Sequence, residues 1–139
     1  MTRRPKVVLD TNVFLSSLLR SKSCLRIFEM LAQRSFILIL SDPLLTELKT
    51  VLTSKEFGNI ADSDIKLLFE TIVENCEIVR PRRSITNCRD TDDNKFLEAA
   101  VESKAGFVVS GDRDLLILKS IEGIPILSPK EFISRFERI

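Results

Sequence analysis

Four acidic residues stand where an apolar stretch of the sequence gives way to a polar one. They are Asp10, Glu47, Asp93 and Asp112. In an open α/β sheet, the carboxyl ends of the strands and the amino ends of the following helices share one edge, where ligands bind. The sequence therefore predicts that these carboxylates converge at such an edge. Clustered carboxylates repel one another unless a positive charge lies among them, and a divalent cation is the simplest candidate.

Asp93 has the strongest positional argument. In the helix predicted to begin there, one stripe at about 100° per residue contains only apolar side chains, namely Phe96, Leu97, Ala100 and Val101. Asp93 falls near the centre of that stripe, whereas Asp92 lies roughly 110° away. A carboxylate aligned with the core face of its helix needs a partner. The alternative is a frayed first turn in which Asp93 only favours the helix dipole. Asp90 and Asp92 are interpreted as capping or loop residues.

The other three acids are less distinctive when each is taken alone. Asp10 ends the apolar run 7–9 and opens a polar tripeptide after which the chain returns at once to apolar residues. Glu47 lies at the rim of an apolar helical stripe, where a solvated glutamate is the better interpretation when the residue is taken alone. Asp112 precedes a predicted helix and has the spacing of a helix cap, with Asp114 as the alternative acid. The hypothesis of a site depends on the four together.

Composition excludes several kinds of chemistry. The chain has 139 residues, 44% hydrophobic and 29% charged, with a net charge of +1, and it contains no histidine, tyrosine or tryptophan. Without histidine, Ser-His-Asp and Cys-His catalysis and histidine-ligated zinc are excluded. The cysteines, Cys24, Cys76 and Cys88, form no CxxC pair, which argues against a disulfide framework or a zinc site. Cys24 and Cys76 are expected in the core.

Short β-branched runs alternate with longer amphipathic stretches along the whole chain, residues 1–139, which we interpret as one domain. This alternation predicts an α/β fold with a parallel sheet flanked by helices on both faces. Strands are expected near 6–10, 36–40, 77–79, 107–110 and 124–127. Helices are expected near 13–20, 24–34, 43–53, 64–75, 93–104, 112–119 and 129–137, with a polar loop at 81–92. Asp42 is the expected N-cap of the third helix, and Gly106 the terminator of the helix that begins at Asp93.

No apolar run approaches the length of a membrane span, and residues 1–5 lead into a strand rather than a signal-peptide core. The sequence therefore predicts a cytoplasmic protein without a membrane partner. Basic residues flank the proposed acidic site in sequence. They are Arg3, Arg4, Lys6, Arg80, Arg82, Arg83 and Arg89. Such runs are usually solvated faces, and contact with a phosphate backbone is the second interpretation.

Four blocks of the sequence resemble the signature blocks of PIN-domain nucleases, and the resemblance spans essentially the whole chain. They are Val-Val-Leu-Asp10-Thr-Asn-Val-Phe, the early helix with Glu47, Asp-Thr-Asp-Asp93-Asn-Lys-Phe-Leu-Glu, and Val-Val-Ser-Gly-Asp112-Arg-Asp. The branch that looks most similar contains VapC-type toxins of toxin–antitoxin systems. The resemblance implies a three-layer α/β/α fold, an endoribonuclease that cleaves single-stranded RNA, a cognate antitoxin protein as partner, and a homodimer.

Carried over residue by residue, the resemblance makes Asp10, Glu47, Asp93 and Asp112 the acidic quartet. Hard oxygen ligands suit Mg²⁺ or Mn²⁺. We expect Asp10 and Asp93 to be direct or near-direct ligands. Glu47 and Asp112 are expected to bind a second or water-bridged metal or to orient the attacking water. Asn12 and Ser110 match supporting positions, and possible contacts with substrate phosphates fall to Arg82, Arg83, Arg89 and Arg113.

Two functions of other classes are alternatives to this hypothesis. A haloacid-dehalogenase-like phosphatase also carries an aspartate after its first strand, but its chemistry requires a second aspartate where this chain has Asn12. A non-catalytic PIN-like or receiver-like binding module remains the other alternative. The presence of all four acids argues against a degenerate site of this kind.

Overall fold

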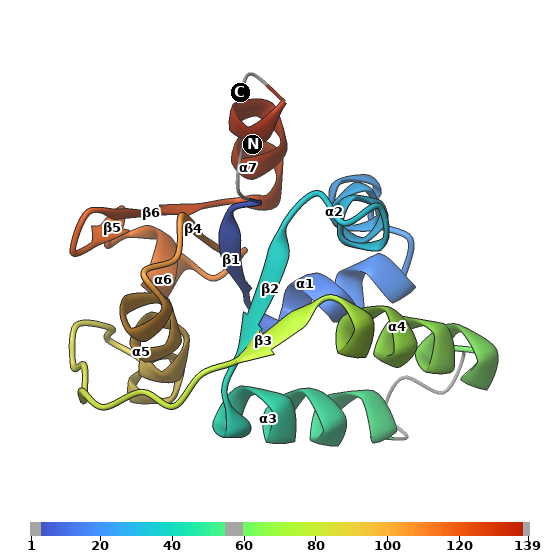
Figure 1. Ribbon diagram of the computed structural model, residues 1–139, viewed down its shortest axis with the longest axis horizontal. Coiled ribbons are helices and arrows are strands. Elements are labelled where there is room, and N and C mark those ends of the chain that lie inside the picture. The colour runs from blue at the N-terminus through green and yellow to red at the C-terminus, as the bar shows by residue number, and fades with distance from the viewer. Residues whose placement is uncertain (1–3, 55–59, 138–139) are drawn as a thin grey trace.

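The central strands consist of apolar residues, and helices cover both of their faces. The computed structural model describes residues 4–54 and 60–137. Its sheet has the strand order β3-β2-β1-β4-β6-β5 (Figure 1). The parallel strands are β1 (Lys6–Leu9), β2 (Ile37–Leu40), β3 (Cys76–Ile78), β4 (Phe107–Val109) and β6 (Ile124–Leu127), while β5 (Ser120–Ile121) pairs antiparallel with β6. The register places Leu9 opposite Val109, so β1 and β4 end at the same edge.

Helices cover both faces of this sheet. The elements are α1 (Thr11–Leu18), α2 (Lys22–Ala32), α3 (Asp42–Thr53), α4 (Asp62–Glu74), the 3₁₀ turn η2 (Thr91–Asp93), α5 (Asn94–Ser103), α6 (Arg113–Leu116) and α7 (Pro129–Phe136). α5 packs on β1, β2 and β4, whereas α7 packs on β4 and β6 and also contacts α2. Figure 1 shows α5 and α7 on opposite sides of the sheet. The predicted three-layer α/β fold is confirmed.

An aromatic cluster joins α7 to the sheet. The Phe132 ring is fully buried and meets the rings of Phe36 and Phe107 edge-on, with centroid distances of 5.8 and 5.4 Å. Edge-to-face contacts of this kind are favoured by the ring quadrupoles. Segments before β2, in β4 and in α7 are therefore held in one apolar core.

Two predicted helix ends are wrong in their details. Ser41, not Asp42, caps α3: its Oγ accepts a hydrogen bond from the Leu44 backbone N–H at 3.4 Å, and Asp42 is the first helical residue, where its charge suits the helix dipole. Lys104, not Gly106, ends α5 with a left-handed backbone, φ 54°. The Gly106 N–H instead donates to the Lys6 carbonyl at 2.8 Å, at the start of β4.

The segment after β4 also differs from expectation. The helix predicted at 112–119 ends at Leu116, and the following residues form the β5–β6 hairpin, which was not predicted. Its turn residues Glu122 and Gly123 have φ values of 48° and 84°. Two successive positive φ values are the signature of the tight hairpin turn that matches strand twist.

The cysteines are free thiols. Cys24 is buried, as predicted, but Cys76 is only partly buried because it begins the edge strand β3. Cys88 is buried in the 81–92 loop, where its N–H donates to the Asn94 side-chain carbonyl at 2.9 Å. Arg3 lies outside the described residues. Within the described ranges, no helix is long and apolar enough to span a membrane.

Candidate active site at the carboxyl edge of the sheet

Asp10 is the most enclosed acid of the site. It directly follows β1, caps α1, and its side chain is 5% exposed. Its Oδ2 accepts a hydrogen bond from the Ser110 hydroxyl at 2.7 Å, and its Oδ1 accepts one from the Asn12 backbone N–H at 3.2 Å. Burial raises the pKa of Asp10, although both hydrogen bonds act to lower it, and the charges of Asp112 and Glu47 raise it further.

Ser110 connects the ends of two neighbouring strands. Its buried hydroxyl donates to Asp10 and accepts a hydrogen bond from the Asp112 backbone N–H at 2.9 Å. The Asp10 N–H in turn donates to the Val109 carbonyl at 2.9 Å. The residues after β4 are thereby fixed against the residue after β1.

Asp112 and Asp114 have different surroundings. Asp112 caps α6 by accepting the Asp114 N–H at 2.9 Å, and its charge acts on the carboxyls of both Asp10 and Asp93. The carbonyl of Asp114 accepts a hydrogen bond from the Cys88 thiol at 3.5 Å. The structure thus brings Asp112 into the acidic group while it also serves as a helix cap.

Asp93 is the most perturbed acid of the group. It closes η2 directly before α5 and is half-buried. Its Oδ2 is buried and receives no hydrogen bond from the described residues. Burial raises the pKa of Asp93 to about 7, together with a side-chain hydrogen bond to Asp112 and the charges of Asp112, Asp90 and Asp10. Burial and the neighbouring carboxylates thus favour the protonated form of this carboxyl.

Glu47 reaches the group from α3. One of its carboxylate oxygens accepts a short hydrogen bond from the Thr11 hydroxyl, and the other lies 2.7 Å from the Lys95 ammonium. Lys95 also lies 3.3 Å from Asp92 Oδ1. Burial alone would lower the pKa of Lys95, but its contacts with Glu47 and Asp92 outweigh burial and raise it.

Thr11 and Lys95 both contact Glu47, and the sequence analysis singled out neither of them. Thr11 stands between Asp10 and Asn12, both of which the sequence analysis singled out. The sequence did not show that Thr11 is buried. Lys95 is the second residue of α5, a helix that directly follows acidic residues. In the sequence, a lysine at this position looks like ordinary charge patterning of a helix surface. Asn94 was also missed, although its buried side chain anchors the preceding loop through Cys88.

Of the predicted supporting and basic residues, Ser110 contacts Asp10 directly, whereas Asn12, Arg82 and Arg83 are placed less closely than expected. Asn12 contacts Asp10 through its backbone, and its side chain is exposed. The Arg82 guanidinium pairs with Glu102 near the end of α5 opposite Asp93, at 3.3 Å. The Arg83 guanidinium pairs with Glu122 in the hairpin turn, at 2.6 Å. These two ion pairs direct both guanidinium groups away from the acids, whereas Arg89 and Arg113 are exposed and lie close to the acids in sequence.

The oxygen donors suit a hard divalent cation in kind. Asp93 has a buried carboxyl oxygen without a hydrogen-bond partner among the described residues, and the pKa of this carboxyl is raised. Both features fit a place where a positive ion would be favourable. However, no three acidic or cysteine side chains in ranges 4–54 and 60–137 are placed to hold an ion together as they stand. The donor chemistry fits, and the carboxylates are coupled electrostatically without yet converging on one point.

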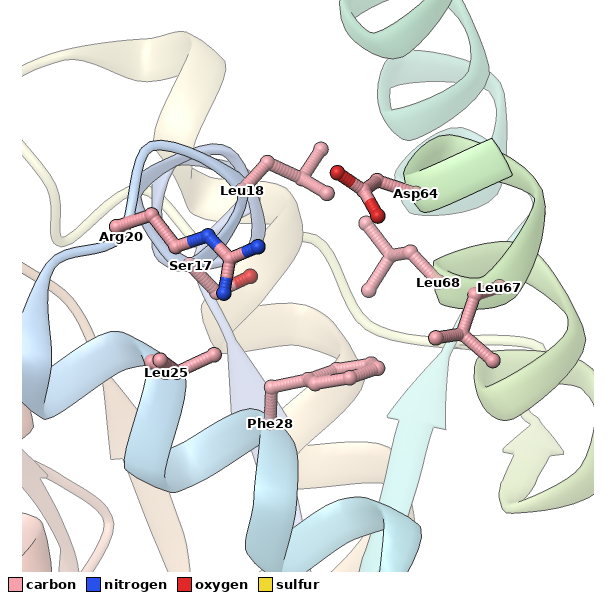
Figure 2. A pocket seen from close by; sticks show the side chains of 8 residues that line it. All are labelled: Ser17, Leu18, Arg20, Leu25, Phe28, Asp64, Leu67 and Leu68. Atoms are coloured by element: carbon pink, nitrogen blue, oxygen red, sulfur yellow. The ribbon is translucent and has the colours of Figure 1, made fainter. Parts of the chain in front are cut away.

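A separate pocket lies at the other end of α1, between α1, α2 and α4. Figure 2 shows its largely apolar lining around the Phe28 ring, with Arg20 and Asp64 at its sides. Asp10 caps the first turn of α1, whereas this pocket uses residues from the last turn onward. The pocket is therefore distinct from the acidic group.

Comparison with known proteins agrees with this architecture. Uncharacterized protein MJ1680 of Methanocaldococcus jannaschii is 31% identical over 144 residues, covering 96% of this chain and 92% of that protein. The structure is similar to PAE2754 from Pyrobaculum aerophilum (TM-score 0.63, 11% identity, 98% of this chain and 92% of that chain). It is also similar to VapBC2 from Rickettsia felis bound to a DNA fragment from their promoter (TM-score 0.58, 16% identity, 88% and 98%).

A third similar structure is the PIN domain endonuclease Utp24 (TM-score 0.54, 24% identity, 88% of this chain and 84% of that chain). At these identities the solved structures establish the fold alone. The family model of the PIN domain matches residues 6–114, a range that contains Asp10, Glu47, Asp93 and Asp112. This match runs from β1 into α6 and covers most of the chain. The chain therefore belongs to the PIN-domain family.

Proposed function

We propose that this protein is a Mg²⁺- or Mn²⁺-dependent endoribonuclease that cleaves single-stranded RNA. The observation that carries the proposal is the electrostatic coupling of Asp10, Asp93 and Asp112 at the carboxyl edge of a PIN-domain sheet. The charge of Asp112 raises the pKa of both Asp10 and Asp93, and carboxylates that interact in this way favour a cation among them. Because the chain has no histidine, hydrolysis of a phosphodiester is left to carboxylates, lysine or arginine, hydroxyl groups and a metal, and we propose the metal with its carboxylate ligands.

Asp10 and Asp93 are the proposed direct ligands, and Asp112 and Glu47 would hold a second or water-bridged cation or orient the attacking water. When bound, the cation supplies a water of lowered pKa and positive charge beside the scissile phosphate. Ser110 and the Asn12 N–H fix the orientation of Asp10. Asp93 would contribute a carboxylate oxygen after losing its proton, since its pKa is raised to about 7.

The partners proposed for this nuclease are an antitoxin protein and a second copy of the chain. The fold similarity to VapBC2 from Rickettsia felis, which spans 98% of that chain, supports the toxin–antitoxin hypothesis. Pull-down from the source cells followed by mass spectrometry tests it: the expected result is a small protein in a stoichiometric complex that inhibits cleavage. Recovery of the free protein only would contradict the antitoxin.

Cleavage of labelled single-stranded RNA tests the activity directly. We expect cleavage with Mn²⁺ or Mg²⁺, none with excess EDTA, and weaker cleavage of duplex RNA or single-stranded DNA. Asp10→Asn and Asp93→Asn should each reduce the rate by at least about a hundredfold, since each removes an oxygen ligand of the proposed cation. Asp92→Asn is the matched control and should keep most of the activity, because Asp92 is 77% exposed.

Each failure has a defined meaning. Undiminished cleavage in EDTA would rule out the metal mechanism. Equal losses in Asp92→Asn and Asp93→Asn would contradict the assignment of Asp93 as the ligand. RNA binding without cleavage under any metal condition would support the non-catalytic binding module.

A further inference from the structure

Lys95 places a positive charge inside the acidic site. Its ammonium lies 2.7 Å from Glu47 Oε1 and 3.3 Å from Asp92 Oδ1. The Lys95 and Glu47 side chains are only 17% and 25% exposed, whereas Asp92 is 77% exposed. Because partial burial reduces screening by water, the contact with Glu47 is the stronger of the two.

Both oxygens of the Glu47 carboxylate are engaged. Thr11, at the start of α1, donates to one oxygen, and Lys95, in the first turn of α5, contacts the other. α3, which carries Glu47, packs against both α1 and α5. Glu47 is therefore held between two neighbouring helices, with one contact on each of its carboxylate oxygens.

We propose that Lys95 is a positioning residue that holds Glu47 while the site contains no divalent cation and that competes with such a cation for the Glu47 carboxylate. The inference rests on the proposed function because it requires a cation site. Among the described residues Glu47 joins no group of acidic or cysteine side chains that could hold an ion as it stands, and its carboxylate is already paired with an ammonium. A divalent ion that takes Glu47 has to displace this contact and bind against the positive charge of Lys95.

Titration of the purified protein with Mn²⁺, followed by calorimetry or by the electron paramagnetic resonance signal of the free ion, tests the competition. Lys95→Met should bind Mn²⁺ about tenfold more tightly than the wild type, because one carboxylate is released and one nearby positive charge is removed. Lys95→Arg keeps the charge and should remain close to the wild type. Lys49→Met removes an exposed lysine from α3, two residues from Glu47, and should leave the affinity unchanged.

A second set of measurements separates competition from a merely structural role. In EDTA, Lys95→Met should melt at a lower temperature than the wild type, since the partly buried Glu47 carboxylate loses the Lys95 ammonium that pairs with it. Saturating Mn²⁺ should remove that deficit. In a Glu47→Gln background, Lys95→Met should give no further gain in Mn²⁺ affinity, because the two residues act through one contact.

The outcomes distinguish this proposal from the proposed function. If the wild type binds Mn²⁺ and Lys95→Met binds it equally or more weakly, the proposed role of Lys95 is overturned, while the proposed metal site is not. An equal gain in Lys49→Met would show a general charge effect and would also overturn the role of Lys95. No Mn²⁺ binding by the wild type or any variant would overturn both the metal site and the competition.

Discussion

Asp93 is a carboxylic acid whose proton is held by the fold. Its pKa of about 7 lies above the ordinary 3.8. Between these pH values the folded protein keeps a proton that the unfolded chain has released. The free energy of unfolding therefore falls as pH rises through this window, and the loss is complete above the folded pKa. The site thus lowers the stability of the cation-free protein at neutral and alkaline pH.

This linkage predicts a specific effect of Asp93→Asn. In EDTA the variant should melt at a higher temperature than the wild type at pH 8, and the difference should shrink toward pH 5, because asparagine does not ionise. Thermal melting across this range measures the difference. Asp92→Asn, at an exposed position, should give a difference that does not change with pH. A constant or reversed difference for Asp93→Asn would contradict the raised pKa.

Cation binding should show the opposite pH dependence. Asp93 has to release its proton to bind Mn²⁺, so the stabilisation that Mn²⁺ gives the wild type should grow from pH 6 to pH 8. Comparing melting temperatures with Mn²⁺ and with EDTA at each pH measures it. Asp10→Asn should lose this stabilisation. A wild type that ignores Mn²⁺ at every pH would favour a structural role for these acids.

Sequence reasoning singled out Asp93 from its position at the start of a helix. The helical wheel placed Asp93 on the core side of its helix, and the structure gives it a buried, unpartnered oxygen. The link from Glu47 to Lys95 was missed for a physical reason. The two residues lie on helices 48 positions apart in sequence whose contact depends on packing, and no local pattern records it.

At the scale of the elements, alternation of apolar runs was sufficient to predict most strands and helices. Caps were harder because neighbouring polar residues compete for one role: Ser41 and Asp42 can both cap a helix, and only the extended backbone of Ser41 decides between them. The β5–β6 hairpin was missed because a two-residue strand is too short to show periodicity. The end of α5 was misplaced because Lys104 adopts a conformation that glycine usually takes.

The end of α5 provides a test at this scale. Lys104 has φ 54°, and its side chain is exposed. Lys104→Gly should raise the free energy of unfolding by about 0.5–1 kcal/mol, since relief of left-handed strain exceeds the added freedom of the unfolded chain. Urea unfolding measures the change. Gly123→Ala, at φ 84°, is the reverse control and should destabilise the protein. A destabilised Lys104→Gly would mean that the lysine side chain contributes more than the strain costs.

At the scale of the whole molecule, α7 completes the core from outside the matched family range, residues 6–114. Phe132→Ala should lower the free energy of unfolding by about 3–5 kcal/mol, as for other fully buried aromatic residues. Ile117→Ala, at 75% exposure, should change it by less than about 0.5 kcal/mol. Chemical denaturation compares the two variants. A small loss for Phe132→Ala would show that the rest of the chain forms its core without α7.

The two edge strands of the sheet are short, which affects whether two copies of this chain can pair through their sheets. Long, flat edge strands invite strand addition from a second molecule, which leads to aggregation. Here one border is β5, two residues in an antiparallel hairpin, and the other is β3, three residues whose Glu77 is engaged by Lys6 at 3.2 Å. Neither offers a template of useful length. Continuation of the sheet between molecules is therefore disfavoured, and any assembly of copies is expected to use surfaces other than the two edge strands.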